Sequence, residues 1–309
     1  GPARQDVRVA RTRYASDPGL TRRMFGTMGG LFLLYVAIGV ALIIFGVSAV
    51  FVLIIAGGLL WGQWYFCDSL ALRAMRAEVV TPEQAPQLHG VVDRLCLLAD
   101  MPKPRIAVAD TEVPNAFATG RSAKRAVVCV TTGLLRRVDR DELEAVLSHE
   151  LSHVAHRDVT VMTIASFAAI VAGLLARSAL WGGMIRGRRD QNTAAVVLVV
   201  LLVSALVYVL SYILTAALSR YRELAADRGG ALLTGNPRAL ASALQKISGE
   251  VARIPTTDLR RMEPVSSMAF VPALSGTRGF DLARIFASHP PLQKRLENLA
   301  KISTELGRE

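Results

Sequence analysis

The sequence predicts a mainly α-helical integral membrane protein with a smaller α+β domain that is assembled from two separate chain segments. Hydrophobic residues make up 52% of the 309 residues and charged residues only 20%, a balance that soluble domains rarely show. Four long apolar runs alternate with polar segments, and the first long polar segment contains short runs that are typical of β-strands. We therefore expect helices within a membrane and a mixed domain beside it.

The four apolar runs predict four transmembrane helices. A stretch of 44 residues near the N-terminus has no charged side chain, and one crossing needs about 20 residues. This stretch predicts two helices, over 24–45 and 48–67, joined by a tight turn. Later runs over 159–176 and 194–219 predict the third and fourth helices. The link between these two runs carries four arginines, which is unusual for an outer loop, so a shallow or re-entrant second hairpin is the competing interpretation.

Polar and apolar segments together divide the chain into five regions. They are a polar arm (1–23), a first transmembrane hairpin (24–67), the first part of a soluble domain (68–158), a second hairpin (159–219) and the second part of that domain (220–309). Most of the basic residues behind the net charge of +11 lie in the polar regions, so placing these regions on the inner side of a membrane obeys the positive-inside tendency. No nucleic-acid-binding motif accompanies the charge, so nucleic acid is not an expected partner. The three widely spaced cysteines predict reduced packing residues.

One helix of the first soluble part presents two histidines on the same side. Asp139 and Glu142 form the N-cap and capping-box pair that begins this helix. His149 and His153 are four residues apart, so their imidazoles point into the same space, as in helices that bind zinc. Glu150 lies beside them, where its carboxylate can take a proton from water activated by the metal. The alternative interpretation is a helix with two ordinary surface histidines.

A second helix offers the third ligand that such a site needs. Glu223 and Asp227 are again four residues apart, and a carboxylate from a separate helix commonly completes a catalytic zinc site. Asp227 is placed to accept the spare N–H of a ligand histidine. If the helices continue, His153 lies about 9 Å before one apolar run and Glu223 about 6 Å after another. We therefore expect the metal just above the membrane surface.

Three short strands are predicted in the first soluble part. Residues 105–109 and 126–131 are rich in β-branched side chains, and a helix precedes them over 87–98. The segment 114–120 between them is a third strand or an edge segment. An edge beside a metal site can pair with an extended peptide, although an ordinary hairpin fits the pattern equally well.

Four sequence motifs together identify a family. HELSHVAHRD, SRYRELAAD, PNAFATG and SHPPLQKR resemble the HtpX family of bacterial membrane zinc metalloproteases, relatives of the CAAX prenyl endoproteases, over nearly the whole chain. The resemblance implies a zincin-like metallopeptidase domain with one Zn²⁺ per chain. It implies His149, His153 and Glu223 as the zinc ligands, Glu150 as the general base and Asp227 as the residue that orients a ligand histidine.

The same resemblance implies residues that contact the substrate. His289 and Arg295, from the His-Pro segment, would lie near the scissile carbonyl and help to hold the oxyanion. Asn115, Ala116 and Phe117, from the predicted edge strand, would line the backbone of the substrate peptide.

The predicted function is a zinc-dependent endopeptidase of the cell membrane, with its active site facing the cytoplasm. The resemblance implies cleavage of misfolded or damaged membrane proteins as a quality-control response to stress, by Glu-assisted attack of zinc-bound water. A narrower protease for prenylated or signal-like peptides is the first alternative. A membrane scaffold or chaperone with a structural metal is the second, but structural zinc sites usually close with four ligands, often cysteines, and no cysteine here has that spacing. A transporter is disfavoured, because the apolar runs contain no internal charge.

Overall fold

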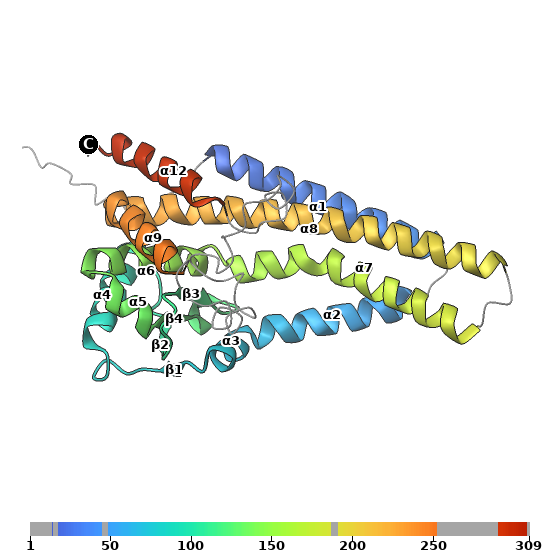
Figure 1. Cartoon of the computed structure of the whole chain (residues 1–309), viewed down its shortest axis with the longest axis horizontal. Coiled ribbons are helices and arrows are strands. Elements are labelled where there is room, and N and C mark those ends of the chain that lie inside the picture. Colours follow the sequence, from blue (N-terminus) through green and yellow to red (C-terminus); the bar gives the residue numbers. More distant parts are fainter. Residues whose placement is uncertain (1–13, 15–17, 45–48, 187–190, 252–289, 308–309) are drawn as a thin grey trace, which may run out of the picture.

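The molecule has two parts along its longest axis, a helical stalk and a broader head that contains a β-sheet (Figure 1). The computed structural model describes Tyr14 and residues 18–44, 49–186, 191–251 and 290–307. The predicted turn between the first two apolar runs, the segment 254–288 and His289 lie outside the described residues.

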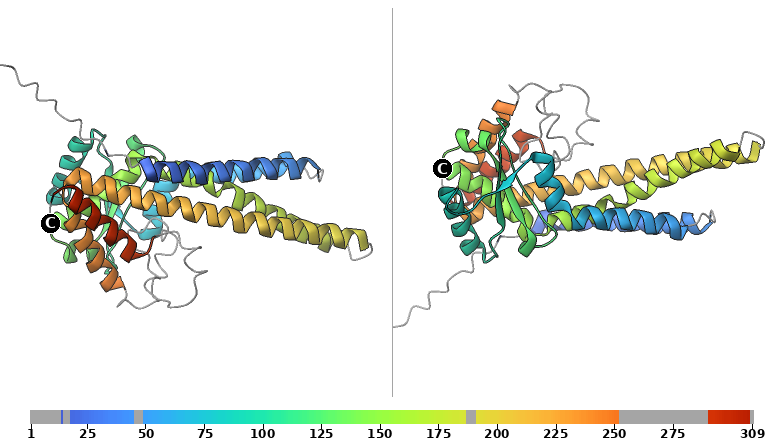
Figure 2. Two further views of the ribbon diagram at one scale, coloured as in Figure 1. Left: turned by 90° about the horizontal axis from the view of Figure 1, so that it is seen from above. Right: turned by 90° about the horizontal axis from the view of Figure 1, so that it is seen from below.

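Four long helices form the stalk, and they correspond to the four predicted apolar runs. They are α1 (Pro18–Ile44), α2 (Ala49–Tyr65), α7 (Asp158–Arg186) and α8 (Gln191–Thr234). Helices α7 and α8 pack along each other, while α1 lies along α8 and α2 along α7 (Figures 1 and 2). The sequence prediction of helices in these four runs is therefore confirmed, whereas the number that cross a membrane belongs to the function proposed below.

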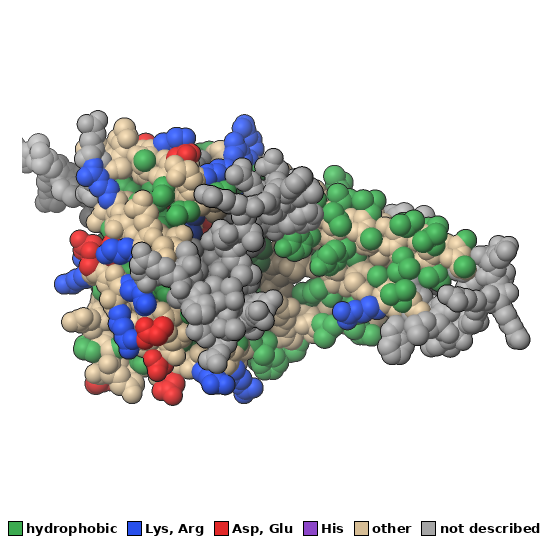
Figure 3. All heavy atoms as spheres, viewed as in Figure 1, with side chains coloured by type: hydrophobic (Ala, Val, Ile, Leu, Met, Phe, Trp, Pro, Cys, Tyr) green, Lys and Arg blue, Asp and Glu red, His purple; other side chains and the backbone are tan. Residues whose placement is uncertain are grey.

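The surface of the stalk is apolar. Hydrophobic side chains are frequent on the stalk in the view of Figure 3, with a basic side chain among them, whereas most of the charged side chains gather on the head. Large side chains that are exposed on the stalk include Phe25, Phe32, Leu33, Phe51, Ile54, Leu59, Leu198, Leu202 and Leu206. Among the described residues, two helical stretches, Asp158–Arg177 and Val197–Thr234, are long and apolar enough to cross a bilayer. A contiguous apolar surface of this size fits a lipid environment better than water.

Helix α8 extends from the end of the stalk deep into the head. Its 44 residues span about 66 Å, roughly twice the thickness of a bilayer core. The apolar residues occupy its first part, and Glu223 and Asp227 lie in its later part, where they contact residues of α6 and α12 in the head. Figure 1 shows this end of α8 within the head. The expectation that a ligand-bearing helix continues from an apolar run is thus met for α8.

The other ligand-bearing helix, α6 (Arg140–Ala155), does not continue into the stalk. Asp139 and Glu142 form the predicted capping box at its start. At its end, His156 is the C-cap and Arg157 has a φ of 56°, a left-handed conformation that ends the helix. Helix α7 begins immediately afterwards at Asp158. The prediction of one continuous helix is therefore wrong at this point.

The sheet of the head has the strand order β1-β2-β4-β3. Its strands are β1 (Glu78–Val79), β2 (Arg105–Ala109), β3 (Ala116–Thr119) and β4 (Val127–Thr131). Strands β2 and β4 are parallel, and β1 and β3 pair antiparallel at the two edges. The strands predicted over 105–109 and 126–131 are confirmed, the first with the same bounds. The uncertain segment 114–120 forms the edge strand β3.

The head also contains shorter helices. They are α3 (Cys67–Met75), α4 (Pro86–Ala99), η1 (Ala123–Arg125), α5 (Thr132–Arg137), α9 (Pro237–Val251) and α12 (Leu292–Glu305). One buried hydrophobic cluster joins residues of the first polar segment to residues of the second, including Phe117, Val128, Leu147, Leu151, Leu240, Leu244, Leu299 and Ile302. The two polar segments thus share one core, which holds α6 between the sheet, α8 and α9.

Candidate metal centre

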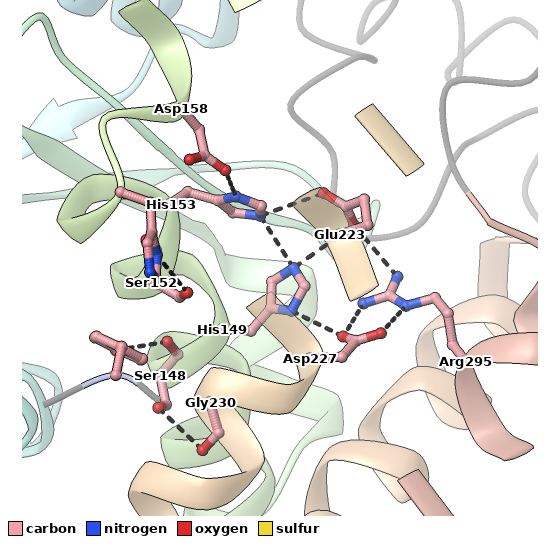
Figure 4. A network of polar contacts seen from close by, with 11 residues as sticks. Ser148, His149, Ser152, His153, Asp158, Glu223, Asp227, Gly230 and Arg295 are labelled. Atoms are coloured by element: carbon pink, nitrogen blue, oxygen red, sulfur yellow. Dashed lines mark hydrogen bonds and ion pairs between the residues drawn. The ribbon is translucent and has the colours of Figure 1, made fainter. Parts of the chain in front are cut away.

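Three side chains from two helices converge where α6 crosses α8 (Figure 4). The Nε2 atoms of His149 and His153 are 3.2 Å apart. The Glu223 carboxylate lies 3.2 Å from His153 Nε2 and 3.6 Å from His149 Nε2. The sequence analysis expected these residues to meet although they are about 70 positions apart in the chain, and the structure places them together.

A glycine allows the two helices to approach this closely. A Cβ atom at Gly230 would lie 3.0 Å from the backbone nitrogen of His149, which is tighter than ordinary packing. The Ser148 hydroxyl donates a hydrogen bond to the Gly230 carbonyl at 3.3 Å. The small residue therefore brings Glu223, two turns earlier on α8, within reach of both imidazoles.

Each imidazole is held from its far side by an aspartate. Asp227 lies 2.9 Å from Nδ1 of His149, and Asp158 lies 2.6 Å from Nδ1 of His153. An ionised carboxylate accepts a hydrogen bond, so the proton of each neutral ring sits on Nδ1 and the lone pair sits on Nε2. The two lone pairs then face each other beside the Glu223 oxygens, an arrangement that is repulsive without a cation.

The donor set fits a zinc ion. Zn²⁺ binds imidazole nitrogens and carboxylate oxygens at about 2.0–2.2 Å in tetrahedral geometry, which requires neighbouring ligand atoms about 3.3 Å apart. The two Nε2 atoms are 3.2 Å apart, and each lies 3.2 or 3.6 Å from a different oxygen of the Glu223 carboxylate, which is close to this requirement.

The surrounding charge also calls for a cation. Among the described residues, buried carboxylates at positions 150, 158, 223 and 227 and buried guanidinium groups at positions 222 and 295 surround the two rings. When all of them are ionised, they leave an excess of two negative charges, which one divalent cation neutralises. Burial acts to lower the pKa of His149, but its contacts with Asp227 and Glu223 raise it above the ordinary value.

Glu150 lies on α6 with 2% of its surface exposed. Burial raises its pKa to about 7, an effect that Glu223 reinforces and that the two imidazoles and a backbone hydrogen bond from Ala118 oppose. Because Ala118 belongs to β3, the carboxylate lies between the HExxH helix and the edge strand. A carboxyl group with a pKa near neutrality is suited to accept and return a proton.

Arg295 on α12 lies at the candidate site and contacts two of its carboxylates. Its Nε and Nη2 atoms donate to the two carboxylate oxygens of Asp227 at 2.7 and 2.6 Å, and its Nη1 lies 3.7 Å from Glu223. Only 2% of Arg295 is exposed. The guanidinium is thus bound to Asp227 behind His149, and these contacts favour a role in positioning Asp227. The role of Arg295 in holding an oxyanion stays a family-based prediction.

The three residues expected to line the substrate are buried in the edge of the sheet. Asn115 is 1% exposed, and Ala116 and Phe117 are fully buried. The Asn115 backbone is fixed to β4 by hydrogen bonds with Thr131. Their side chains therefore belong to the core, and β3 can offer a peptide only its backbone edge.

Sequence reasoning missed two residues of the site. From the sequence, position 158 is only the end of the first soluble part and Arg222 has no assigned role, yet the two residues form an ion pair next to His153. A signal was present in the sequence, because both residues are charged and border apolar runs, where an unpaired charge is costly.

Two histidines one turn apart, a carboxylate from a second helix and a buried glutamate beside them define a site of the metallopeptidase type. The sequence pattern of peptidase family M48 matches residues 82–303. "Protease HtpX homolog 1" of Streptomyces coelicolor is 56% identical over 296 residues, covering 96% of this chain and 97% of that protein. "Protease HtpX homolog" of Moorella thermoacetica is 48% identical over 297 residues, covering 96% and 98%.

The chain therefore belongs to peptidase family M48, among the HtpX proteases, and the resemblance drawn from its motifs is confirmed. The family supports a membrane metalloprotease. The chain also aligns with the crystal structure of S. mikatae Ste24p at 18% identity and a TM-score of 0.48, covering 87% of this chain and 67% of that one.

Proposed function

We propose that this chain is a membrane-embedded zinc metalloendopeptidase in which His149, His153 and Glu223 hold one zinc ion. The observation that carries the proposal is the convergence of three ligand atoms, all within 4.8 Å of one another, from two helices that are distant in sequence. Bound zinc would supply Lewis-acid assistance to the attack of water on a peptide bond.

In the proposed reaction, Glu150 removes a proton from the attacking water and passes it to the leaving amine. Its burial and its position beside the histidines support this role. Asp227 and Asp158 keep the Nδ1 protons of the ligand histidines in place, so that both rings keep their Nε2 lone pairs for the metal. The edge of β3 that does not pair with β4 would pair with the extended backbone of the substrate next to Glu150. A role for His289 near the scissile carbonyl remains part of the family-based prediction.

We further propose that all four stalk helices are transmembrane, that the head faces the cytoplasm and that the two polar segments form one split zincin-like domain. The exposed apolar side chains of the stalk and the core shared by both polar segments support this arrangement. The metal centre lies where the head meets the stalk, because Asp158 is the first residue of α7. This position suits misfolded or damaged membrane proteins as substrates.

Replacing Glu150 tests the catalytic assignment. Glu150→Gln should retain zinc and lower kcat about 10²–10⁴-fold, since it removes proton transfer but no ligand. His149→Ala and Glu223→Ala should lose zinc as well as activity. Glu144→Gln on the same helix, where Glu144 pairs with Arg94, is the control that should cleave normally. Cleavage by Glu150→Gln at the wild-type rate would exclude the mechanism.

A substrate panel tests the proposed task. Purified full-length protein in lipid nanodiscs should cleave a membrane protein with a destabilised fold faster than its stable counterpart. Preference for a prenylated peptide over both would assign the narrower role instead.

A further inference from the structure

Asp158 and Arg222 form a contact chain with His153. Oδ2 of Asp158 lies 2.6 Å from Nδ1 of His153, and its other oxygen forms an ion pair with Arg222. Arg222 also donates a hydrogen bond of 3.1 Å to the carbonyl of His156, at the end of α6. Asp158 and Arg222 are 9% and 7% exposed, so this chain of contacts is largely shielded from water.

The same order of groups occurs at the other imidazole. There the chain runs from His149 through Asp227 to Arg295. We call the group of His149, Asp227 and Arg295 the deep arm, and the group of His153, Asp158 and Arg222 the stalk arm. In both arms an aspartate contacts the ring nitrogen that faces away from the metal position, and an arginine neutralises that aspartate (Figure 4); Arg222 itself is placed by its ion pair and is not labelled in the figure.

The acidic residue at position 158 could simply stabilise the start of α7, but its contacts do not support this explanation. An acidic residue in the first turn of a helix is often favoured by the helix dipole, and Asp158 is the first residue of α7. Its carboxylate oxygens, however, contact His153 and Arg222. The left-handed conformation of Arg157 turns the chain between α6 and α7, so that the start of α7 faces the last turn of α6.

We propose that Asp158 and Arg222 are positioning residues, with Asp158 fixing the ring orientation and tautomer of His153 and Arg222 holding Asp158. This inference rests on the proposed zinc site. The proposal also links the metal site to the stalk, because Asp158 is the first residue of α7 and Arg222 lies on α8. The position of His153 as a ligand thus depends on how the two longest stalk helices sit against each other.

Zinc affinity and the Co²⁺ spectrum of the full-length protein test this role without an activity assay. Metal-free protein in detergent is titrated with Zn²⁺ against a chromophoric chelator, and Co²⁺ is substituted to record its d–d absorption. Asp158→Ala should weaken zinc binding about 10–100-fold, the usual cost of losing a residue that orients a ligand, and should shift the Co²⁺ bands. Asp158→Asn keeps the size of the side chain and should give a smaller change of the same sign, as should Arg222→Met.

Asp68→Ala is the matched control. Asp68 also lies in the first turn of a helix, α3, and forms an ion pair with an arginine, Arg105, but it contacts neither histidine. Its zinc affinity and Co²⁺ spectrum should equal those of the wild type. Far-UV circular dichroism of each metal-free variant verifies its helix content, and Asp158→Asn replaces Asp158→Ala if the latter does not fold.

The outcomes separate this inference from the proposed function. If the wild type binds no zinc, the proposed function fails. If the wild type binds zinc and cleaves, but Asp158→Asn and Asp158→Ala leave both the affinity and the spectrum unchanged, only the positioning role is overturned.

Discussion

The deep arm and the stalk arm have similar chemistry in different surroundings. In the deep arm, the side chains of His149 and Asp227 are each 1% exposed, whereas in the stalk arm those of His153 and Asp158 are 16% and 12% exposed. The arginine of the deep arm comes from α12 at the C-terminal end of the head, and that of the stalk arm comes from α8. Because a charge without a partner is more costly where water is excluded, the deep arm should govern stability and the stalk arm chiefly the geometry of the ligand.

Removal of Arg295 should produce the largest loss of stability. Arg295→Ala leaves the Asp227 carboxylate buried without its bidentate partner, which should lower the free energy of unfolding by about 3–5 kcal/mol. The control is Arg228→Ala, because Arg228 also joins α8 to α12, through Glu305 at 3.0 Å, but Arg228 is only half-buried and the Glu305 side chain is exposed. That change should cost about 0–1 kcal/mol. Denaturant unfolding of the solubilised variants measures these losses. If both variants lose the same free energy of unfolding, the deep arm does not govern stability.

A substitution at Gly230 disturbs the deep arm without removing a charged group. The added methyl group of Gly230→Ala would lie 3.0 Å from the His149 backbone, and the overpacking should cost about 1–3 kcal/mol. Alanine raises helix propensity by up to about 1 kcal/mol, which offsets part of this loss. Zinc affinity should fall too, because α6 and α8 move apart.

Gly90→Ala controls for helix propensity. Gly90 lies in α4 with no atom within 4 Å of the added methyl group, so this variant should be as stable as the wild type or more stable, by up to about 1 kcal/mol. Thermal unfolding compares the two variants. A Gly230→Ala protein that gained stability and kept its zinc affinity would show that the helix crossing is not tight.

The smallest expected effect concerns a carboxylate outside both arms. Burial acts to raise the pKa of Glu142, but hydrogen bonds from Lys246 and Ser242 and from the Asp139 N–H lower it below the ordinary value. The folded pKa is therefore below the unfolded one, so the stabilisation is fully present above the ordinary value of 4.5 and is lost as the pH falls through the folded pKa.

The free energy of unfolding of Glu142→Gln should therefore fall less steeply than that of the wild type below about pH 4.5. The difference should be about 1 kcal/mol or less, because Lys246 is exposed to solvent. Unfolding at a series of pH values, for wild type and Glu142→Gln with the metal removed, measures this change. If the free energy of unfolding falls equally steeply at acid pH in both proteins, the acid sensitivity comes from the carboxylates of the two arms instead.

Local spacing was sufficient to predict the parts of the site that lie on one helix. His149, Glu150 and His153 lie within about one helical turn, so their arrangement follows from the helical repeat. The capping box of Asp139 and Glu142 marks where the helix begins. Glu223 was predicted because its chemistry supplies the ligand that the histidines lack. The apolar runs predicted the stalk helices because their lengths exceed those of ordinary core helices.

Features that depend on tertiary structure were not predictable in this way. The two-residue strand β1 has too little sequence to show a pattern, and its pairing with β2 is non-local. The break after α6 results from one left-handed residue, Arg157, which carries no turn signature such as glycine. Because the stalk arm forms only after this break, helical spacing did not predict the contact of Asp158 with His153, although a charge beside an apolar run indicated that Asp158 needs a partner. Likewise, the contact of Arg295 with Asp227 arises from how α12 docks.

The continuous helix α8 sets the distance between the apolar run of the stalk and the proposed metal site. Its proposed zinc ligand, Glu223, lies four residues beyond the end of the apolar run at Ser219, a rise of about 6 Å along a continuous helix. If the proposed function is correct, the length of α8 fixes how far above the bilayer the peptide bond is cleaved. Cleavage sites in different membrane substrates should therefore fall at a similar distance from the hydrophobic segment of each substrate, whatever their local sequence.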